Sequence, residues 1–190
     1  LTDKNSWHMD INKGLLPFIE HKDGKIIHDS LDVCDWLQDY TQEGLDLYPD
    51  GADRQKAKDT IQEWFMKVII FIIVIVNKER REKEETVREI QDSLEWVESQ
   101  LPDDSENIYI GGEAHETMID LMVLPFFKGV FILKETQLKE TYYDQIDFGK
   151  IPKVMRWYDS LDAKYLNTLV DDRAFINYIA KNIEANGPKV

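Results

Sequence analysis

The sequence predicts a small α/β segment followed by an all-helical region that makes up most of the chain. Three observations lead to this fold class. Two short apolar runs flank a turn signal at Asp23-Gly24, which is typical of a pair of β-strands. Residues 44–51 hold Pro49 and two glycines, which favours a linker. Beyond this linker, apolar residues recur at three- and four-residue spacing, as they do on one face of a helix.

The two predicted strands cover residues 15–20 and 24–28. Pro17 lies at the head of the first strand, and a proline belongs at an edge, a strand start or a bulge because it cannot donate to a sheet ladder. If the bond between Leu16 and Pro17 is cis, the backbone groups of Leu16 face outward and are free to pair with an extended peptide. This segment is therefore a candidate site for a peptide backbone.

A helix is expected to begin at Asp29 or Ser30. The unpaired N–H groups and the dipole of a helix N-terminus favour a carboxylate, and the Asp29 side chain can hold an ammonium group. Both residue types are also preferred N-caps, and capping is compatible with ligand binding because several N–H groups are free at one helix start. Together with Leu16, these features describe a receptor for a small zwitterionic peptide.

The remaining sequence is predicted to be helical. The helix after Ser30 shows Leu31, Cys34 and Leu37 on one face. The apolar run 68–76 has half the length needed to span a bilayer, so it is expected to be the buried middle of a long helix. Further helices are expected over residues 54–76, 87–101, 117–133, 151–163 and 171–184, and Pro125 should kink the central one or start a new turn.

Composition excludes several classes of function. The net charge of −14, from 37 acidic and 23 basic residues, gives the chain little reason to bind nucleic acid or an anionic membrane. One cysteine permits no intramolecular disulfide, which suits a reducing, cytoplasmic compartment. The four histidines show no metal-ligand spacing with one another or with the cysteine, so no metal site is expected.

Six motifs fall in order along nearly the whole chain. They are Asp3-Lys4-Asn5-Ser6-Trp7, Leu16-Pro17, Asp29-Ser30, Leu47-Tyr48-Pro49-Asp50, Gly111-Gly112 with Thr117-Met118-Ile119-Asp120-Leu121, and Pro152-Lys153 through Trp157. This series resembles the omega class of the glutathione S-transferase family. Each motif alone is weak, whereas the full series in register is a specific signal.

The resemblance implies that the chain is divided into three parts. These are an incomplete thioredoxin-like domain over residues 1–43, a linker over 44–51 and an all-helical C-terminal domain over 52–190. It also implies glutathione as the co-substrate, held by Lys4, Leu16, Asp29 and Ser30. Structural roles are implied for Pro17, at the family's cis-proline position, and for Thr117 and Asp120. The last two have the spacing of a capping box and are expected to support folding of the helical domain without touching substrate.

Two further residues have competing interpretations. In the omega class, a tryptophan at the position of Trp157 lines the site for the electrophilic substrate, but a core role is equally compatible with the sequence. Cys34 lies one turn into its helix, on the apolar face and beside Asp32 and Asp35. Because a catalytic thiol needs exposure and a lowered pKa, Cys34 is expected to be a buried structural cysteine.

By resemblance, the parent protein is a thioltransferase and dehydroascorbate reductase, an oxidoreductase-type transferase that works as a homodimer. The family carries its catalytic cysteine on a strand–helix–strand segment that has no counterpart before Lys4. The catalytic residue is therefore expected to lie outside this chain, and the chain alone is expected to be inactive. The alternatives are a catalytically inactive glutathione-transferase-like interaction module and a protein like the chloride intracellular channels, which share this fold.

Overall fold

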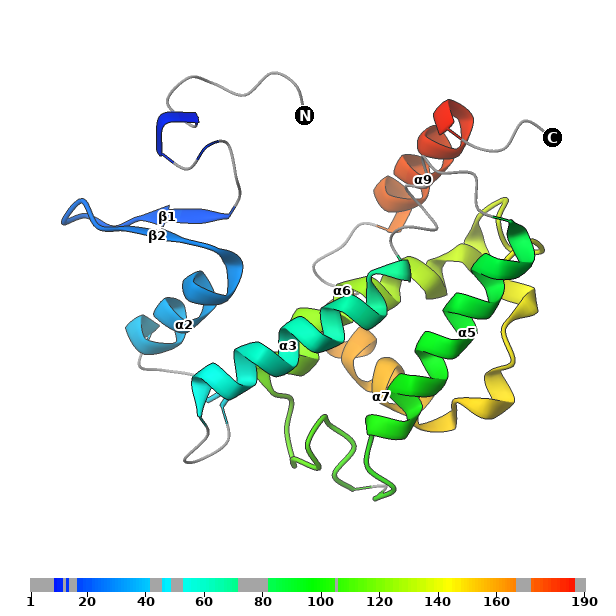
Figure 1. Cartoon of the computed structure of the whole chain (residues 1–190), viewed down its shortest axis with the longest axis horizontal. Helices are drawn as coiled ribbons and strands as arrows, with labels where there is room; N and C mark the ends of the chain where they lie inside the picture. The colour runs from blue at the N-terminus through cyan, green and yellow to red at the C-terminus, as the bar shows by residue number, and fades with distance from the viewer. Residues whose placement is uncertain are drawn as a thin grey trace. The chain divides into compact units, whose positions relative to one another are not determined.

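A computed structural model describes residues 9–11, 13, 17–41, 46–48, 53–71, 82–104, 106–166 and 172–186. The chain divides into two compact units, Leu1–Leu47 and Tyr48–Val190. Figure 1 shows the elements of each unit. The predicted fold class, an α/β segment followed by a helical region, is confirmed, since the part of unit 2 that is described contains helices and turns but no strand.

The first unit contains a two-stranded sheet and one helix. Strand β1 (Phe18–Glu20) pairs antiparallel with β2 (Ile26–His28), with Ile19 opposite Ile27. The predicted turn between them is confirmed. Gly24 has a φ of 82°, a left-handed conformation that costs glycine little, and its N–H donates to the carbonyl of His21 over 2.8 Å.

Helix α2 (Ser30–Thr41) follows β2 directly, as predicted, and contacts both strands. Its buried side chains are Leu31 and Val33, both at its N-terminal end. The expected face was only partly right: Cys34 is half-buried and Leu37 is 41% exposed. The three-residue strands are too short to cover more than the first turns of α2, so the residues next to the sheet are the ones that become buried.

The second unit is built from five helices among its described residues. They are α3 (Arg54–Val68), α5 (Lys83–Gln100), α6 (Met118–Phe131), α7 (Pro152–Leu161) and α9 (Asp172–Asn186), joined in part by the 3₁₀ turns η1 (Ile132–Glu135), η2 (Tyr143–Gln145) and η3 (Phe148–Lys150) and by the π-helical segment η4 (Asp162–Leu166). None of the helices in the described ranges is long and apolar enough to cross a membrane. Residues 72–76 of the long apolar run lie outside these ranges.

Helix α6 is the centre of this unit, as its continuous apolar sequence predicts. It contacts α3, α7 and η1, and Phe127 at its centre has no exposed surface. The ring of Phe127 meets the ring of Trp157 edge-on, with the centroids 4.9 Å apart. Pro125 does not start a new helix, because α6 continues through it with the proline on an exposed side.

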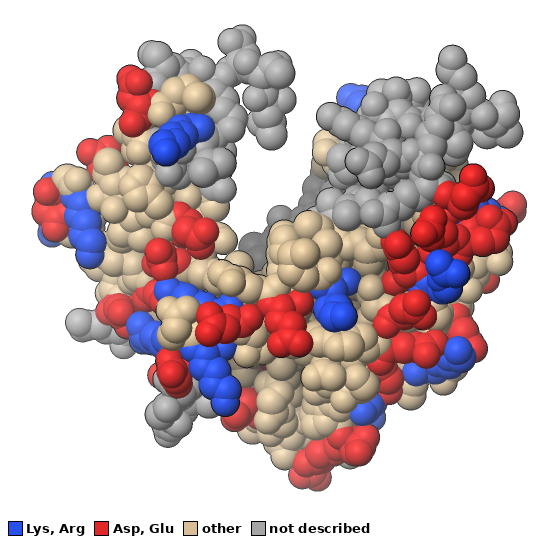
Figure 2. All heavy atoms as spheres, viewed as in Figure 1, with Lys and Arg blue, Asp and Glu red and all other residues tan. Residues whose placement is uncertain are grey.

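Helix α5 has the amphipathic character that its sequence predicts. Ile90, Leu94 and Val97 are fully buried, and the helix ends where Leu101 adopts an extended backbone. Its opposite side is polar, and acidic and basic side chains are interspersed on the molecular face that Figure 2 shows. Because α5 buries its apolar face, the polar side chains on its other side, such as Glu98, can contact α7.

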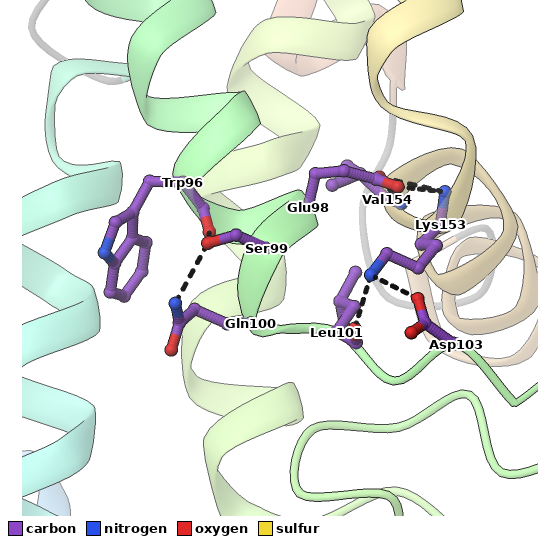
Figure 3. A network of polar contacts seen from close by, with 8 residues as sticks. All are labelled: Trp96, Glu98, Ser99, Gln100, Leu101, Asp103, Lys153 and Val154. Carbon is purple, nitrogen blue, oxygen red and sulfur yellow. Dashed lines mark hydrogen bonds and ion pairs between the residues drawn. The ribbon is translucent and has the colours of Figure 1, made fainter.

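Polar contacts from α5 hold the start of α7 (Figure 3). The carboxylate of Glu98 accepts from the backbone N–H groups of Lys153 and Val154, both over 2.9 Å. The Lys153 ammonium in turn donates to the Leu101 carbonyl over 2.7 Å and to Asp103 over 3.2 Å. A side chain of one helix thus satisfies the unpaired N–H groups at the start of another.

Candidate functional site

The start of α2 is the candidate binding site in the first unit. Asp29 precedes the helix with a φ of 72°, in the left-handed region that aspartate tolerates better than most residues. Its Oδ1 accepts from the Leu31 N–H over 2.9 Å, and its carbonyl accepts from the Val33 N–H over 3.0 Å. Asp29 is therefore the N-cap of α2.

Ser30 is placed differently from its neighbour. It is half-buried at the first position of α2, and its hydroxyl makes no hydrogen bond within the part of the chain that the structure describes. The second carboxylate oxygen of Asp29 is likewise without a partner among the described residues. The helix start thus offers a hydroxyl and a carboxylate oxygen to a ligand, next to the positive end of the helix dipole.

The other residues predicted to contact glutathione lie outside the described ranges. They are Lys4 and Leu16, whose contacts with glutathione stay predictions. Pro17 is exposed and directly precedes β1. This is a position that a proline accepts easily because no ladder donor is needed there.

A cavity of about 410 Å³ lies along β2 and α2 but not at the helix start. His28 and Trp36 line it together with three aspartates of α2, and Lys25 is the basic residue on its wall. Neither Asp29 nor Ser30 lines this cavity. Its acidic wall favours cations, which distinguishes this cavity from the start of α2.

Cys34 is not poised for nucleophilic chemistry. Partial burial raises the pKa of its thiol, and the carboxylates of Asp35 and Asp29 raise it further. The thiolate is the reactive form, so a raised pKa keeps Cys34 unreactive near neutral pH. It is half-buried rather than buried as predicted, but the direction of its pKa agrees with the expectation that it is not a catalytic thiol.

Asp120 forms the predicted capping box at the start of α6. Its Oδ2 accepts from the backbone N–H and the hydroxyl of Thr117, both over 2.7 Å. Its Oδ1 accepts from the Ile110 N–H over 3.0 Å and from the indole N–H of Trp157 over 2.6 Å. Burial raises the pKa of Asp120, although all four donors favour the charged form. This carboxylate joins three segments of the unit and lies away from solvent.

Trp157 is part of the same cluster. It has no exposed surface, its indole N–H is used by Asp120, and its ring packs on Phe127. Of the two interpretations that the sequence left open, these contacts favour the core role, since a wholly buried ring presents no surface to a substrate. The structure brings Trp157 together with Thr117 and Asp120, two of the three residues that were expected to have structural roles.

Two buried charged residues were not found by the sequence analysis. Lys128 is 7% exposed near the end of α6, and Glu116 is 1% exposed just before that helix. The Glu116 carboxylate accepts from Lys164 and from the hydroxyl of Tyr165. A lysine inside an almost wholly apolar helix was the available signal for Lys128. The sequence carries no comparable signal for the burial of Glu116, because glutamates are common before helices and are usually exposed.

Comparison with known proteins shows which family the sequence resembles. No protein-family model matches the sequence. The chain is 24% identical over 183 residues to mouse glutathione S-transferase omega-1, covering 94% of this chain and 71% of that protein. This similarity supports the glutathione S-transferase family.

Solved structures agree on the fold. A trimeric glutathione transferase from Leishmania superposes with a TM-score of 0.71 at 18% identity, covering 97% of this chain and 41% of that one. A rice glutathione transferase in complex with glutathione gives a TM-score of 0.68 at 17% identity, covering 97% of this chain and 82% of that one. At this identity the likeness concerns the fold, which is that of a partial thioredoxin-like domain followed by an all-helical domain.

Proposed function

We propose that this protein is a glutathione transferase of the omega type, which exchanges glutathione with electrophiles and mixed disulfides. The observation that carries the proposal is the start of α2, where a strand leads into a capped helix with the Ser30 hydroxyl unoccupied among the described residues. The similarity to mouse omega-1 over 94% of the chain supports it independently. So does the glutathione bound to the rice enzyme that shares this fold.

Each group at the helix start has a role in this proposal. The Ser30 hydroxyl and the N-terminal turn of α2 hold a carboxylate of glutathione. Asp29 caps the helix with one oxygen and accepts from the ammonium group of the peptide with the other. Lys4 supplies a cation, which the acidic surroundings of the ligand require, and the Leu16 backbone pairs with the peptide. Trp157 and Asp120 maintain the helical domain.

The proposed chemistry is thiol–disulfide exchange. A thiolate attacks one sulfur of a mixed disulfide, the S–S bond breaks, and the other sulfur leaves as a thiolate. Cys34 takes no part, because its raised pKa lowers the thiolate fraction. The proposal extends to a cytoplasmic homodimer with a small electrophilic or disulfide substrate, as the omega resemblance implies.

A second candidate is a glutathione-binding module without catalysis. One observation favours it: Cys34 is the only cysteine of the 190 residues, and its environment suppresses the thiolate. This candidate keeps the binding role of Asp29 and Ser30. It differs from the first in predicting no turnover.

One experiment separates the two candidates. The complete protein encoded by the gene is passed over immobilised glutathione and assayed for glutathione-dependent reduction of hydroxyethyl disulfide and dehydroascorbate. Retention with turnover that survives Cys34→Ser supports the transferase. Retention without turnover supports the binding module. Absence of both retention and turnover overturns both candidates. Activity that disappears in Cys34→Ser would show that Cys34 takes part in the reaction, contrary to the proposal.

A further inference from the structure

The cavity of the first unit lies along the edge of strand β2. The four consecutive residues 25–28 all line it. Successive side chains of a strand point to opposite faces of the sheet, so four neighbours border one space when that space lies along the strand edge. Helix α2, which lies beside β2 (Figure 1), forms the other wall. The cavity is therefore a groove between a strand edge and a helix.

The backbone groups of Ile26 point to this edge. The N–H of His21 donates to the carbonyl of Lys25 over 2.8 Å, so these two residues form a hydrogen-bonded pair. The register pairs Ile19 with Ile27, which is the next hydrogen-bonded pair because bonded and non-bonded pairs alternate along an antiparallel ladder. Ile26 lies between them, so its N–H and its carbonyl are turned away from β1. Ile26 thus presents one donor and one acceptor on the side of the groove.

The wall of the groove on α2 is negatively charged. Asp32, Asp35 and Asp39 line it at three- and four-residue spacing, so they lie on one side of the helix over about 10 Å of its length. Lys25 is the basic residue among the described residues of the lining, so three carboxylates outnumber one ammonium group. Trp36 lines the same wall, and its ring can pack on the stem or the charged end of a long cationic side chain.

The strand edge and the charged wall place two requirements on an occupant. A strand edge pairs with an extended backbone, and a negative wall attracts cations. Every second side chain of an extended peptide points to the same side, at intervals of about 7 Å. Neighbouring carboxylates on one side of a helix are about 5–6 Å apart. Lysine or arginine side chains at alternate positions of an extended peptide can therefore reach successive aspartates of α2.

We propose that this groove binds an extended, basic segment of a partner protein, which adds a strand to β2. One residue of the segment exchanges two hydrogen bonds with Ile26, and its alternate lysine or arginine side chains pair with the aspartates of α2. Neither Asp29 nor Ser30 lines the groove, so this surface is separate from the helix start proposed for glutathione. The inference goes beyond the transferase function and does not rest on it.

An NMR titration of the complete encoded protein tests the proposal. The probe is an acetylated and amidated pentapeptide that alternates lysine with valine. Its addition should shift the amide signal of Ile26 and slow the hydrogen exchange of that amide. The same peptide with glutamate in place of lysine should not bind. A version with every amide N-methylated keeps the charges but cannot donate to the Ile26 carbonyl, so it should bind roughly tenfold more weakly.

A matched pair of variants tests the charged wall. Asp39→Asn should weaken binding of the lysine peptide about two- to fivefold, the change expected when a solvent-exposed ion pair is lost. Asp10→Asn removes the same charge from an exposed position of the same unit that does not line the groove, and it should leave the affinity unchanged. Equal effects of the two variants would overturn the assignment of α2 as the charged wall.

Four other results would overturn the proposal. Equal binding of the N-methylated and unmethylated peptides would show that charge alone attracts them, without an added strand. Spermidine that binds as tightly as the lysine peptide would show a site for small polyamines. A dimer in which the Ile26 amide is protected before any peptide is added would show an interface between two copies of this chain. No binding of the lysine peptide would show that the carboxylates only protect a strand edge from unwanted pairing.

Discussion

At the scale of single residues, Asp120 and Asp53 offer a comparison between a buried cap and an exposed one. Asp120 is fully buried, and Ala at this position would leave the donors of Thr117, Ile110 and Trp157 unpaired. Each stranded buried donor costs about 1–3 kcal/mol, so Asp120→Ala should lower the free energy of unfolding by at least about 3 kcal/mol.

Asp53 provides the matched control. It is exposed and caps α3 by accepting from the N–H groups of Gln55 and Lys56 over 2.9 and 3.3 Å. Asp53→Ala should cost about 1 kcal/mol, because water replaces the lost acceptor. Urea unfolding of both variants gives the two values. Equal losses in the free energy of unfolding would show that the buried hydrogen bonds of Asp120 stabilise the protein no more than the exposed cap of Asp53.

The pKa of Cys34 leads to a prediction on its reactivity. Burial and the charges of Asp35 and Asp29 raise the pKa of the thiol, so at pH 7 its thiolate fraction is smaller than that of an unperturbed cysteine. Alkylation by iodoacetamide should be slower than in a cysteine peptide at pH 7 and should increase as the pH rises. Asp35→Asn should speed it by lowering this pKa. Alkylation faster than in the peptide would contradict the assignment.

At the scale of elements, the contact of α5 with α7 depends on Glu98. Its carboxylate accepts from the first N–H groups of α7 at Lys153 and Val154, where a negative charge also complements the helix dipole. Glu98→Ala should lower the free energy of unfolding by about 1–3 kcal/mol. Gln100→Ala, in the same turn but bonded only within α5 among the described residues, should cost about 0.5 kcal/mol or less.

Hydrogen exchange provides the second measurement on this contact. With Glu98 truncated, the amides of Lys153 and Val154 should lose protection more than the rest of α7. A variant with unchanged stability, or with protection lost evenly over the helix, would mean that water satisfies these N–H groups as well as Glu98 does.

Local sequence signals predicted the elements well. Asp29 marked the start of α2, and Thr117 with Asp120 marked the start of α6, because capping depends on residues a few positions apart. The contact of Glu98 with Val154 joins residues 56 positions apart. Such a pairing follows from how helices pack, and no spacing along the chain indicates it.

At the scale of the whole molecule, periodicity and turn chemistry were sufficient for the fold class. The turn at Gly24 and the apolar faces of α5 and α6 each have a local physical cause, and together they separate a strand-containing segment from a helical one. The candidate site was predictable only in part. The helix start follows from Asp29, whereas the burial of Trp157 depends on tertiary contacts that the sequence left open.

The ion-pair partners of Lys128 could not be predicted from local sequence signals. The lysine stands out in the sequence of α6, but its partners Asp162 and Asp172 come from segments that follow much later in the chain. Many exposed aspartates would have been equally good candidates on composition alone, since the chain holds 37 acidic residues. Packing selects two of them.

The most direct test of the proposed function is calorimetric titration of the complete encoded protein with glutathione. Ser30→Ala should weaken binding roughly 10- to 150-fold, which corresponds to about 1.5–3 kcal/mol for a hydrogen bond to a charged group. Ser99→Ala, an exposed serine at the end of α5, should leave the affinity unchanged. Unchanged affinity in both Ser30→Ala and Asp29→Ala would contradict the placement of glutathione at the start of α2.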